Sequence, residues 1–282
     1  MAEELISVVM PVFRPNISQL KLAVESVLDQ TYHNLELIIV YKKSSNKVDS
    51  EVTKIFETKM DEHRIRIIEN DESFVDALNT GIKSSKGEII GRMDSDDICV
   101  NTRFEEQVNF IHDTGVSIVG SWVYSISDDG HIIGTIEPPS EPEEIRKKMM
   151  FHCPISHSSI TMKKDMLEKI GYYDPEFAGA EDYELYFRAL SKNYKIANIP
   201  KYLIYIRETS SSIMRGNQWK AARRSYIKAK NKAMSHYGFN RYYDVFYGLL
   251  TPISLFITPR LAYQMKNRFG WYRDVRMQTN NT

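Results

Sequence analysis

Runs rich in isoleucine and valine alternate with helix-like segments over the first hundred residues of the chain. The apolar runs cover residues 5–12, 35–41, 64–70 and 88–94. Between them, apolar residues recur at helical spacing, most clearly over 16–29 and 74–84. Strands that alternate with helices at this spacing predict βαβ units. We therefore expect an α/β fold with a Rossmann-like, mostly parallel sheet flanked by helices.

The pattern becomes mixed after residue 100. Thr102-x-x-Glu105 predicts a capping box at the start of a helix. Residues 116–127 and 131–137 flank an Asp129-Gly130 turn and predict a hairpin. Further helices are expected over 143–151 and 163–171, and from Gly179 through Ser191. We expect one continuous domain over residues 1–215, followed by a tail over 216–282.

The tail carries a charge that the zero net charge of the chain conceals. From Lys220 onward there are twelve lysines and arginines against two aspartates, or about +10. An apolar stretch, 245–257, is interrupted by Pro252 and is too short to span a bilayer readily. Basic and aromatic residues flank it. This basic, amphipathic, helical tail is expected either to lie in an anionic membrane interface or to pack on the main domain. No nucleic-acid-binding motif accompanies the charge, so no nucleic-acid partner is expected.

The two cysteines, Cys99 and Cys153, have neither zinc-site spacing nor the pattern of a disulfide framework. Residues 1–4 are acidic and the apolar run after them is short, which is not typical of a signal peptide. We expect a cytoplasmic protein, with peripheral contact to the membrane through the tail.

Three carboxylates crowd the end of the fourth apolar run, in Asp94-Ser95-Asp96-Asp97. Such crowding is costly unless a cation lies among the carboxylates, and Mg²⁺ commonly takes one or two carboxylates plus substrate phosphates. An acidic surface turn is the alternative. An EF-hand calcium loop is excluded, because Cys99 stands where that loop needs glycine. In parallel sheets, ligands bind beyond the carboxyl ends of the strands, where this cluster is expected.

A second acidic pair, Glu181-Asp182, opens the helix that continues to Ser191. Acidic residues at a helix N-terminus can simply favour the helix dipole. Beside a metal-binding cluster, one of them could instead take a proton from an attacking hydroxyl.

Six short motifs resemble those of the family 2 glycosyltransferases with the GT-A fold, and the resemblance covers about residues 5–215. In chain order they are Ser7-Val8-Val9-Met10-Pro11-Val12-Phe13, Ser26-Val27-Leu28-Asp29-Gln30-Thr31-Tyr32, Ala77-Leu78-Asn79-Thr80-Gly81-Ile82, Gly87-Glu88, Arg92-Met93-Asp94-Ser95-Asp96-Asp97 and Glu181-Asp182-Tyr183.

The resemblance implies a metal-dependent, hexosyltransferase-type enzyme. It would transfer a sugar, with inversion, from a nucleotide diphosphate sugar to a hydroxyl of a glycan or lipid-linked acceptor in cell-surface polysaccharide biosynthesis. Residues 1–100 would bind the donor and 101–215 the acceptor.

The resemblance also implies roles for single residues. Asp96 would be the main ligand of Mg²⁺ or Mn²⁺, and Asp94 would contact the metal or the donor ribose. Asp182 would be the base, with Glu181 supporting it. His157 would either line the acceptor side or be structural. The remaining expected donor contacts are Pro11, Phe13, Tyr41, Asn79, Arg92 and Ser95.

The chain departs from the family pattern mainly where the donor base is recognised. Tyr41 and Lys42 stand where the family usually has a carboxylate for the base, so we expect Tyr41 to stack on the base and the nucleotide need not contain uracil. Arg14, Ser73 and Thr209 replace an asparagine, a glycine and a histidine. These changes leave open a catalytically silent partner module. A sugar nucleotidyltransferase is a weaker alternative, because residues 11–15 are not a glycine-rich basic loop.

Overall fold

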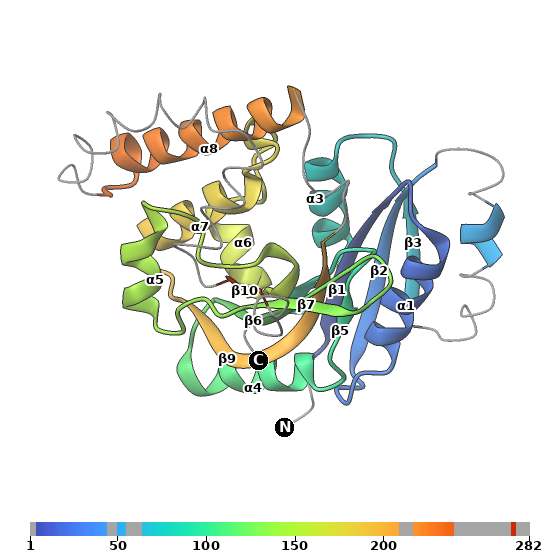
Figure 1. The fold of residues 1–282 in the computed structure, drawn as a ribbon. Coiled ribbons are helices and arrows are strands. Elements are labelled where there is room, and N and C mark those ends of the chain that lie inside the picture. Colours follow the sequence, from blue (N-terminus) through green and yellow to red (C-terminus); the bar gives the residue numbers. More distant parts are fainter. Residues whose placement is uncertain (1–3, 44–49, 55–63, 209–216, 240–271, 275–282) are drawn as a thin grey trace, which may run out of the picture.

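The computed structural model describes residues 4–43, 50–54, 64–208, 217–239 and 272–274. Its N-terminal half is a parallel sheet in the order β3-β2-β1-β4 (Figure 1). The strands are β1 (Ile6–Phe13), β2 (Leu35–Lys42), β3 (Ile65–Glu69) and β4 (Ile89–Arg92). All four predicted strands are confirmed, and the carboxyl ends of these parallel strands share one edge.

Helices cover both faces of these strands. Helix α1 (Ile17–Leu28) begins at Asn16, whose side chain accepts hydrogen bonds from two backbone N–H groups of the first turn. Helix α3 (Phe74–Ser84) begins at Ser73 in the same way. Successive residues of β1 point to opposite faces. Val8 therefore packs in the core that contains α1, and Val9 in the core that contains α3. The two helices lie on opposite sides of the strands (Figure 1).

The C-terminal half extends the sheet with antiparallel and mixed pairs. Strand β8 (Thr161–Lys163) joins β4 to β6 (Ile118–Ile126), antiparallel to both. The predicted hairpin is confirmed, because β6 pairs antiparallel with β7 (Ile132–Ile136), which in turn pairs with β10 (Tyr272–Asp274). The long strand β9 (Ile196–Arg207) runs parallel to β6 and also pairs with β5 (Ile98–Cys99).

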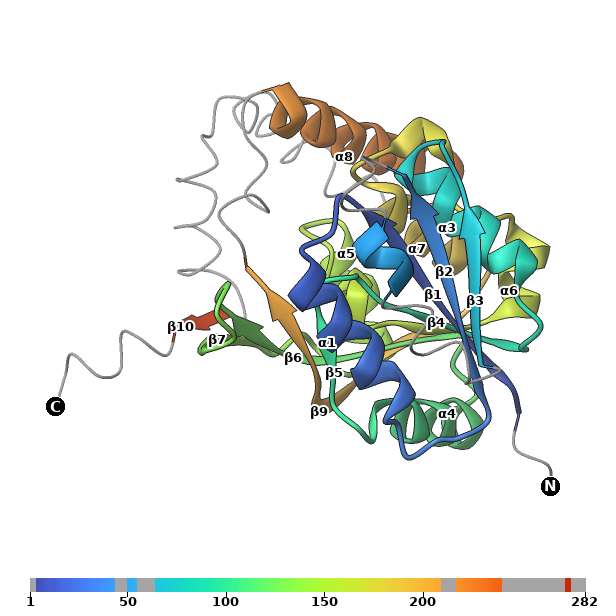
Figure 2. The same cartoon turned by 90° about the vertical axis from the view of Figure 1, so that its right-hand side faces the viewer.

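Helix α4 (Arg103–Thr114) lies on the same face of the sheet as α1 (Figure 2). The helix is where the sequence predicted it, but the capping box is wrong. The Thr102 side chain makes no capping hydrogen bond. The Glu105 carboxylate instead accepts a hydrogen bond from the Thr31 hydroxyl at 2.6 Å.

Four further helices lie on the α3 side. They are α5 (Pro142–Met149), α6 (Lys164–Ile170), α7 (Glu181–Ser191) and α8 (Asn217–His236), with short 3₁₀ turns η1 (His157–Ser159) and η2 (Pro175–Phe177). The three helices predicted over 143–191 are confirmed.

Helix α8 begins the basic tail and packs on α7 (Figure 1). The Tyr226 ring stacks on the Tyr183 ring at 4.3 Å between centroids. Lys232 donates to the buried Glu184 carboxylate at 2.9 Å. This part of the tail therefore adds to the core of the main domain. The apolar stretch 245–257, which was expected either to lie in a membrane interface or to pack on the main domain, lies outside the described residues. Within the described chain, no helix combines the length and apolar character needed to cross a membrane.

Candidate functional site

The acidic cluster begins directly after β4, at the carboxyl edge of the sheet. The buried Arg92 guanidinium forms an ion pair with Asp94. Although burial opposes the charge of Arg92, Asp94 raises the pKa of this guanidinium above its usual value. Burial raises the pKa of Asp96, and the negative charge of Asp94 adds to the rise. Asp94 and Asp96 are thus close enough to repel each other, and both are only half-buried.

Asp97 has a different role from its neighbours, and the sequence did not reveal it. Only 1 % of the residue is exposed, which excludes a simple surface turn for this part of the cluster. Its carboxylate accepts hydrogen bonds from the Ser158 hydroxyl and, at 2.9 Å, from the Arg207 backbone N–H. Burial, followed by the charges of its acidic neighbours, raises the pKa of Asp97 to about 8. Asp97 thereby ties η1 and the end of β9 to the cluster.

Arg207 adds a second connection between β9 and the acidic cluster. Its guanidinium donates to the Asp96 backbone carbonyl at 3.0 Å and to the carbonyls of Ser127 and Asp128 at 2.8 and 2.9 Å. The cluster is therefore held in part by a residue more than a hundred positions away along the chain.

The Glu181-Asp182 pair forms the N-terminus of α7. One Glu181 oxygen accepts the Gly179 N–H at 2.6 Å, and one Asp182 oxygen accepts the Tyr183 N–H at 2.8 Å. Burial and the charge of Glu181 raise the pKa of Asp182 to about 7. A carboxyl group with this pKa can exchange a proton near neutral pH, as a general base requires.

Tyr173 links the two acidic groups. Burial raises its pKa well above the usual value, and smaller contributions come from the charges of Asp182, Glu181 and Asp94. Its hydroxyl shares a 2.8 Å hydrogen bond with the His157 ring. The structure therefore brings the two sequence-predicted acidic sites to one place, around a tyrosine that no sequence motif singled out.

His157 is half-buried in this arrangement. Burial lowers its pKa well below the usual value, and the charge of Arg92 contributes. The ring is thus neutral at physiological pH and is held by Tyr173, in keeping with the structural alternative for this histidine.

A cavity of about 250 Å³ lies at the carboxyl ends of β1 and β2, beside α3. Pro11 and Phe13, which the resemblance assigned to the donor, line it together with Lys42 and Asn70. Phe74 also lines it, and the Arg92 guanidinium lies 5.8 Å from the centroid of that ring. The cavity therefore continues toward the acidic cluster.

Tyr41 and Asn79 are placed differently from the other expected donor residues. Tyr41 is 4 % exposed and its ring packs in the core on the α1 side, because alternation along β2 points Val40 and Lys42 toward the cavity instead. The Asn79 amide exchanges hydrogen bonds of 2.8 and 3.0 Å with the Tyr173 backbone. In these positions Tyr41 fills the core and Asn79 holds Tyr173.

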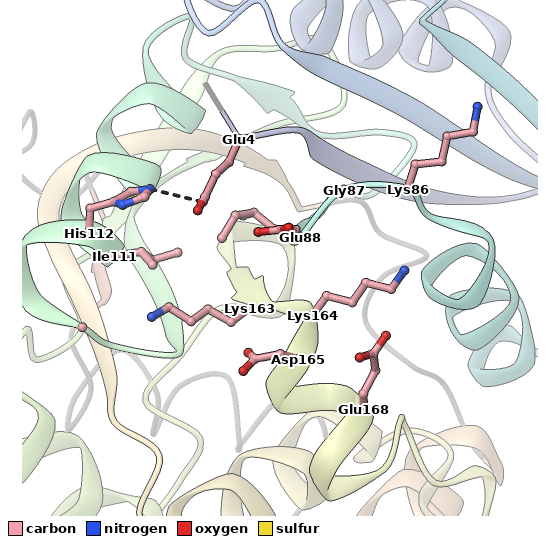
Figure 3. Close-up of a pocket in the computed structure, with 12 residues that line it drawn as sticks. Glu4, Lys86, Gly87, Glu88, Ile111, His112, Lys163, Lys164, Asp165 and Glu168 are labelled. Atoms are coloured by element: carbon pink, nitrogen blue, oxygen red, sulfur yellow. Dashed lines mark ion pairs between the residues drawn. The ribbon is translucent and has the colours of Figure 1, made fainter. Parts of the chain in front are cut away.

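A larger cavity, about 680 Å³, lies at the opposite edge of the sheet. Its side chains carry both signs of charge, and Glu4 pairs with His112 at 3.2 Å (Figure 3). Residues at the amino ends of β1 and β4 line it, whereas parallel sheets bind ligands at the carboxyl ends. The acidic edge is therefore the candidate active site.

Comparison with known proteins agrees with this assignment. The model of the family described as glycosyl transferase family 2 matches residues 7–171. The chain belongs to this family. It is 28% identical to an uncharacterized glycosyltransferase, MJ1057, of Methanocaldococcus jannaschii, over 92% of this chain and 91% of that protein. It is 30% identical to the O-antigen biosynthesis glycosyltransferase WbnJ of Escherichia coli, over 72% of this chain and 80% of that protein. These family 2 relatives confirm the sequence resemblance.

Solved structures agree on the GT-A fold. A mannosyltransferase, PcManGT, from Pyrobaculum calidifontis, in complex with GDP-Man and Mn²⁺, superposes with a TM-score of 0.59 at 18% identity. That match covers 81% of this chain and 64% of the other, so this family 2 chain spans somewhat less than two thirds of the mannosyltransferase. The S. aureus TarS fragment 1–349 in complex with UDP has a TM-score of 0.58 at 16% identity, over 85% of this chain and 72% of that one.

Proposed function

We propose that this protein is an inverting glycosyltransferase. It transfers a sugar from a nucleotide diphosphate sugar to a hydroxyl of a glycan or lipid-linked acceptor, in the synthesis of a cell-surface polysaccharide. The observation that carries the proposal is that both acidic groups lie within electrostatic range of Tyr173, whose hydroxyl is hydrogen-bonded to His157 beside the Ser158 that binds Asp97. The Asp94 cluster can serve the leaving group, and the Glu181-Asp182 pair can serve the acceptor.

The 250 Å³ cavity would receive the nucleoside of the donor. Phe13, 54 % exposed, offers an aromatic surface, and Lys42 lies 5.9 Å from the centroid of this ring. Asn70 adds an amide that can bind a base edge. These residues replace Tyr41 in our proposal for base recognition. Ser95 stays a proposed donor contact because it lies half-buried between the two proposed metal ligands.

Asp94 and Asp96 are the residues that would hold Mg²⁺ or Mn²⁺. They fit this role because carboxylate oxygens are hard ligands. Burial and the charge of Asp94 raise the pKa of Asp96, and a bound cation would relieve the repulsion between the two carboxylates. Within the described part of the chain, no three His, Cys, Asp or Glu side chains form a metal-binding group. Donor phosphate oxygens and water would therefore complete the coordination shell. When bound, the metal supplies positive charge against the charge that develops on the departing diphosphate.

The chain's own residues complete the reaction. Asp182 accepts the proton of the acceptor hydroxyl as that oxygen forms its bond to the anomeric carbon. The bond from the anomeric carbon to the diphosphate oxygen breaks, and its electron pair leaves with the nucleoside diphosphate. Attack opposite the leaving group inverts the anomeric configuration. Arg92, buried beside Asp94, keeps a positive charge at the diphosphate side of the site.

The proposal is tested by incubating the protein with UDP-, GDP- and dTDP-sugars, Mn²⁺ and a lipid diphosphate-linked N-acetylglucosamine. This acceptor is chosen because a relative, WfaP of Escherichia coli, is named as a β-1,3-glucosyltransferase acting on α-D-GlcNAc-diphosphoundecaprenol. That relative is 31% identical over 67% of this chain and 72% of its own length. NMR of the product should show an anomeric configuration opposite to that of the donor. A product with retained configuration, or no turnover of any donor, would contradict the proposal.

We also propose that residues 240–282 bring the enzyme to an anionic membrane. Five of the chain's arginines and one lysine lie there against two aspartates, and the apolar stretch 245–257 lies among them. Co-sedimentation with vesicles containing phosphatidylglycerol should be strong for the full chain and weak for a chain that ends at Phe239. Equal sedimentation of the two proteins would remove the proposal.

A further inference from the structure

Four basic side chains gather where α5 meets α8. Lys148 lies in the last turn of α5 and His152 just after it, while Arg223 and Lys230 lie on α8. The Lys230 ammonium donates to the Phe151 carbonyl at 3.1 Å, which holds the two segments together. All four side chains are half-buried. We call these four residues the α5–α8 basic cluster.

The members of the cluster act on one another electrostatically. Burial lowers the pKa of Lys230 to about 8, and the charge of Arg223 adds to the shift. Burial lowers the pKa of His152 to about 4, with further contributions from Lys148 and Lys230. Like charges in a partly desolvated place repel, and an anion bound among them would relieve that repulsion. The cluster thus has the electrostatic character of an anion-binding site.

The cluster also lies next to the proposed base. Arg223, Tyr226 and Lys230 follow the spacing i, i+3, i+7, so they share one face of α8. Tyr226 stacks on Tyr183, the residue that follows Asp182. Arg223 and Lys230 are therefore each about one turn of helix, about 5 Å along the axis, from Tyr226, which stacks on the neighbour of the proposed base.

A second connection runs through Cys153, which follows His152. Burial raises the pKa of the Cys153 thiol, and the negative charge of Asp182 adds to the rise. The two segments that carry the cations therefore both approach Asp182, on the acceptor side of the site.

We infer that the α5–α8 basic cluster binds the phosphate or diphosphate through which the acceptor sugar is attached to its carrier. The inference rests on the proposed function, because Asp182 as base defines the acceptor side. Guanidinium and ammonium groups are side chains that bind phosphate oxygens strongly, and a neutral imidazole can donate one hydrogen bond. In the proposed function the donor diphosphate lies elsewhere, beside Arg92 and the metal that Asp94 and Asp96 would hold. WfaP and WfgD of Escherichia coli are both named for acceptors that carry such a diphosphate.

Decyl diphosphate and inorganic pyrophosphate, titrated calorimetrically with EDTA present, test the inference. Because neither donor nor metal is present, the result does not depend on whether the protein transfers sugar. We expect decyl diphosphate to bind wild type, and Lys230→Gln and Arg223→Gln to weaken binding by about tenfold or more, as loss of a charge-assisted hydrogen bond predicts. Lys228→Gln is the matched control. Lys228 lies on the same helix but pairs with the exposed Glu176 at 2.7 Å, so this variant should bind like wild type.

Three results would overturn the inference. They are no binding to wild type, equal binding by wild type and by folded Lys230→Gln and Arg223→Gln, and binding of pyrophosphate with exclusion of decyl diphosphate. The last result would mean a site for a free anion rather than a carrier-linked one. Circular dichroism of each variant checks its fold, and the two separate substitutions keep the test decisive if one variant misfolds. Failure of the proposed function would look different, because no nucleotide sugar would be turned over.

Discussion

Replacing Asp182 with asparagine should remove the proton acceptor while keeping the shape of the site. The Asp182 carboxylate accepts the Tyr183 N–H at 2.8 Å, and the asparagine carbonyl can keep that hydrogen bond. A general base commonly contributes about 10²- to 10⁴-fold to the rate. At about 1.4 kcal/mol for each factor of ten, the barrier should rise by about 3 to 5 kcal/mol. We expect kcat to fall accordingly, with donor KM nearly unchanged.

The pH dependence tests the same residue independently. Burial and then Glu181 raise the pKa of Asp182 to about 7. The base acts only when it is ionised, so kcat/KM should rise with pH through about 7 and level off above it. In Glu181→Gln the neighbouring negative charge is gone, which favours ionisation of Asp182. The rise should therefore move to lower pH.

The assay is release of nucleoside diphosphate in the presence of acceptor, from about pH 5 to about pH 9. Asp165→Asn is the control, because this aspartate is exposed on α6, away from the site, and pairs with Lys169 at 2.8 Å. A loss of less than about tenfold in Asp182→Asn would refute the assignment of the base. A pH profile that is the same in Glu181→Gln as in wild type would also refute it.

Two further predictions concern stability, measured by urea unfolding. Gly81→Ala should destabilise the fold by about 1–3 kcal/mol, because the added Cβ would lie 2.4 Å from a Val9 methyl carbon. This cost should outweigh the better helix propensity of alanine. An increase in stability would contradict the close contact of α3 and β1. Lys232→Met should cost about 1–3 kcal/mol, because Lys232 donates to the fully buried Glu184 carboxylate at 2.9 Å. Lys228→Met, which breaks an exposed ion pair and removes an ammonium 4.8 Å from the Phe177 ring centroid, should cost less than about 1 kcal/mol. Equal costs for the two lysines would show that α8 does not depend on the buried pair.

The parts of the fold that the sequence predicted are those with a strong local pattern. The β1–β4 runs and the amphipathic helices α1 and α3 each carry their periodicity within a dozen residues. The predicted capping box was wrong because Glu105 binds a residue that is far away in the sequence. Glu105 had two possible partners, and Thr31, 74 positions away, provides the hydrogen bond.

The placement of Tyr41 could have been predicted from alternation. Tyr41 has the same parity along β2 as Leu37 and Ile39, which pack in the core on the α1 side. The resemblance placed it at the donor because of its position after the strand. Alternation along β2 instead points the Tyr41 ring to the α1 side of the sheet, away from the cavity.

The rest of the site depends on contacts that no local pattern contains. Asp97 is buried because Ser158 and Arg207, 61 and 110 positions away, cover it and bind its carboxylate. Tyr173 joins the two acidic groups only after α3 and α7 have packed. The sequence left open whether the basic residues of α8 lie at a membrane or pack on the main domain, and the contact of Tyr226 with Tyr183 is what places them near the proposed base.

The central claim is that the two acidic groups form one metal-assisted transfer site, and the most direct test is nucleoside diphosphate release as a function of Mn²⁺ concentration. The account predicts that release by wild type requires the metal and saturates with it. In Asp96→Asn, release should fall by about a hundredfold or more, while the protein stays folded. Release that does not depend on the metal, or that is equal in Asp96→Asn and wild type, would contradict the account.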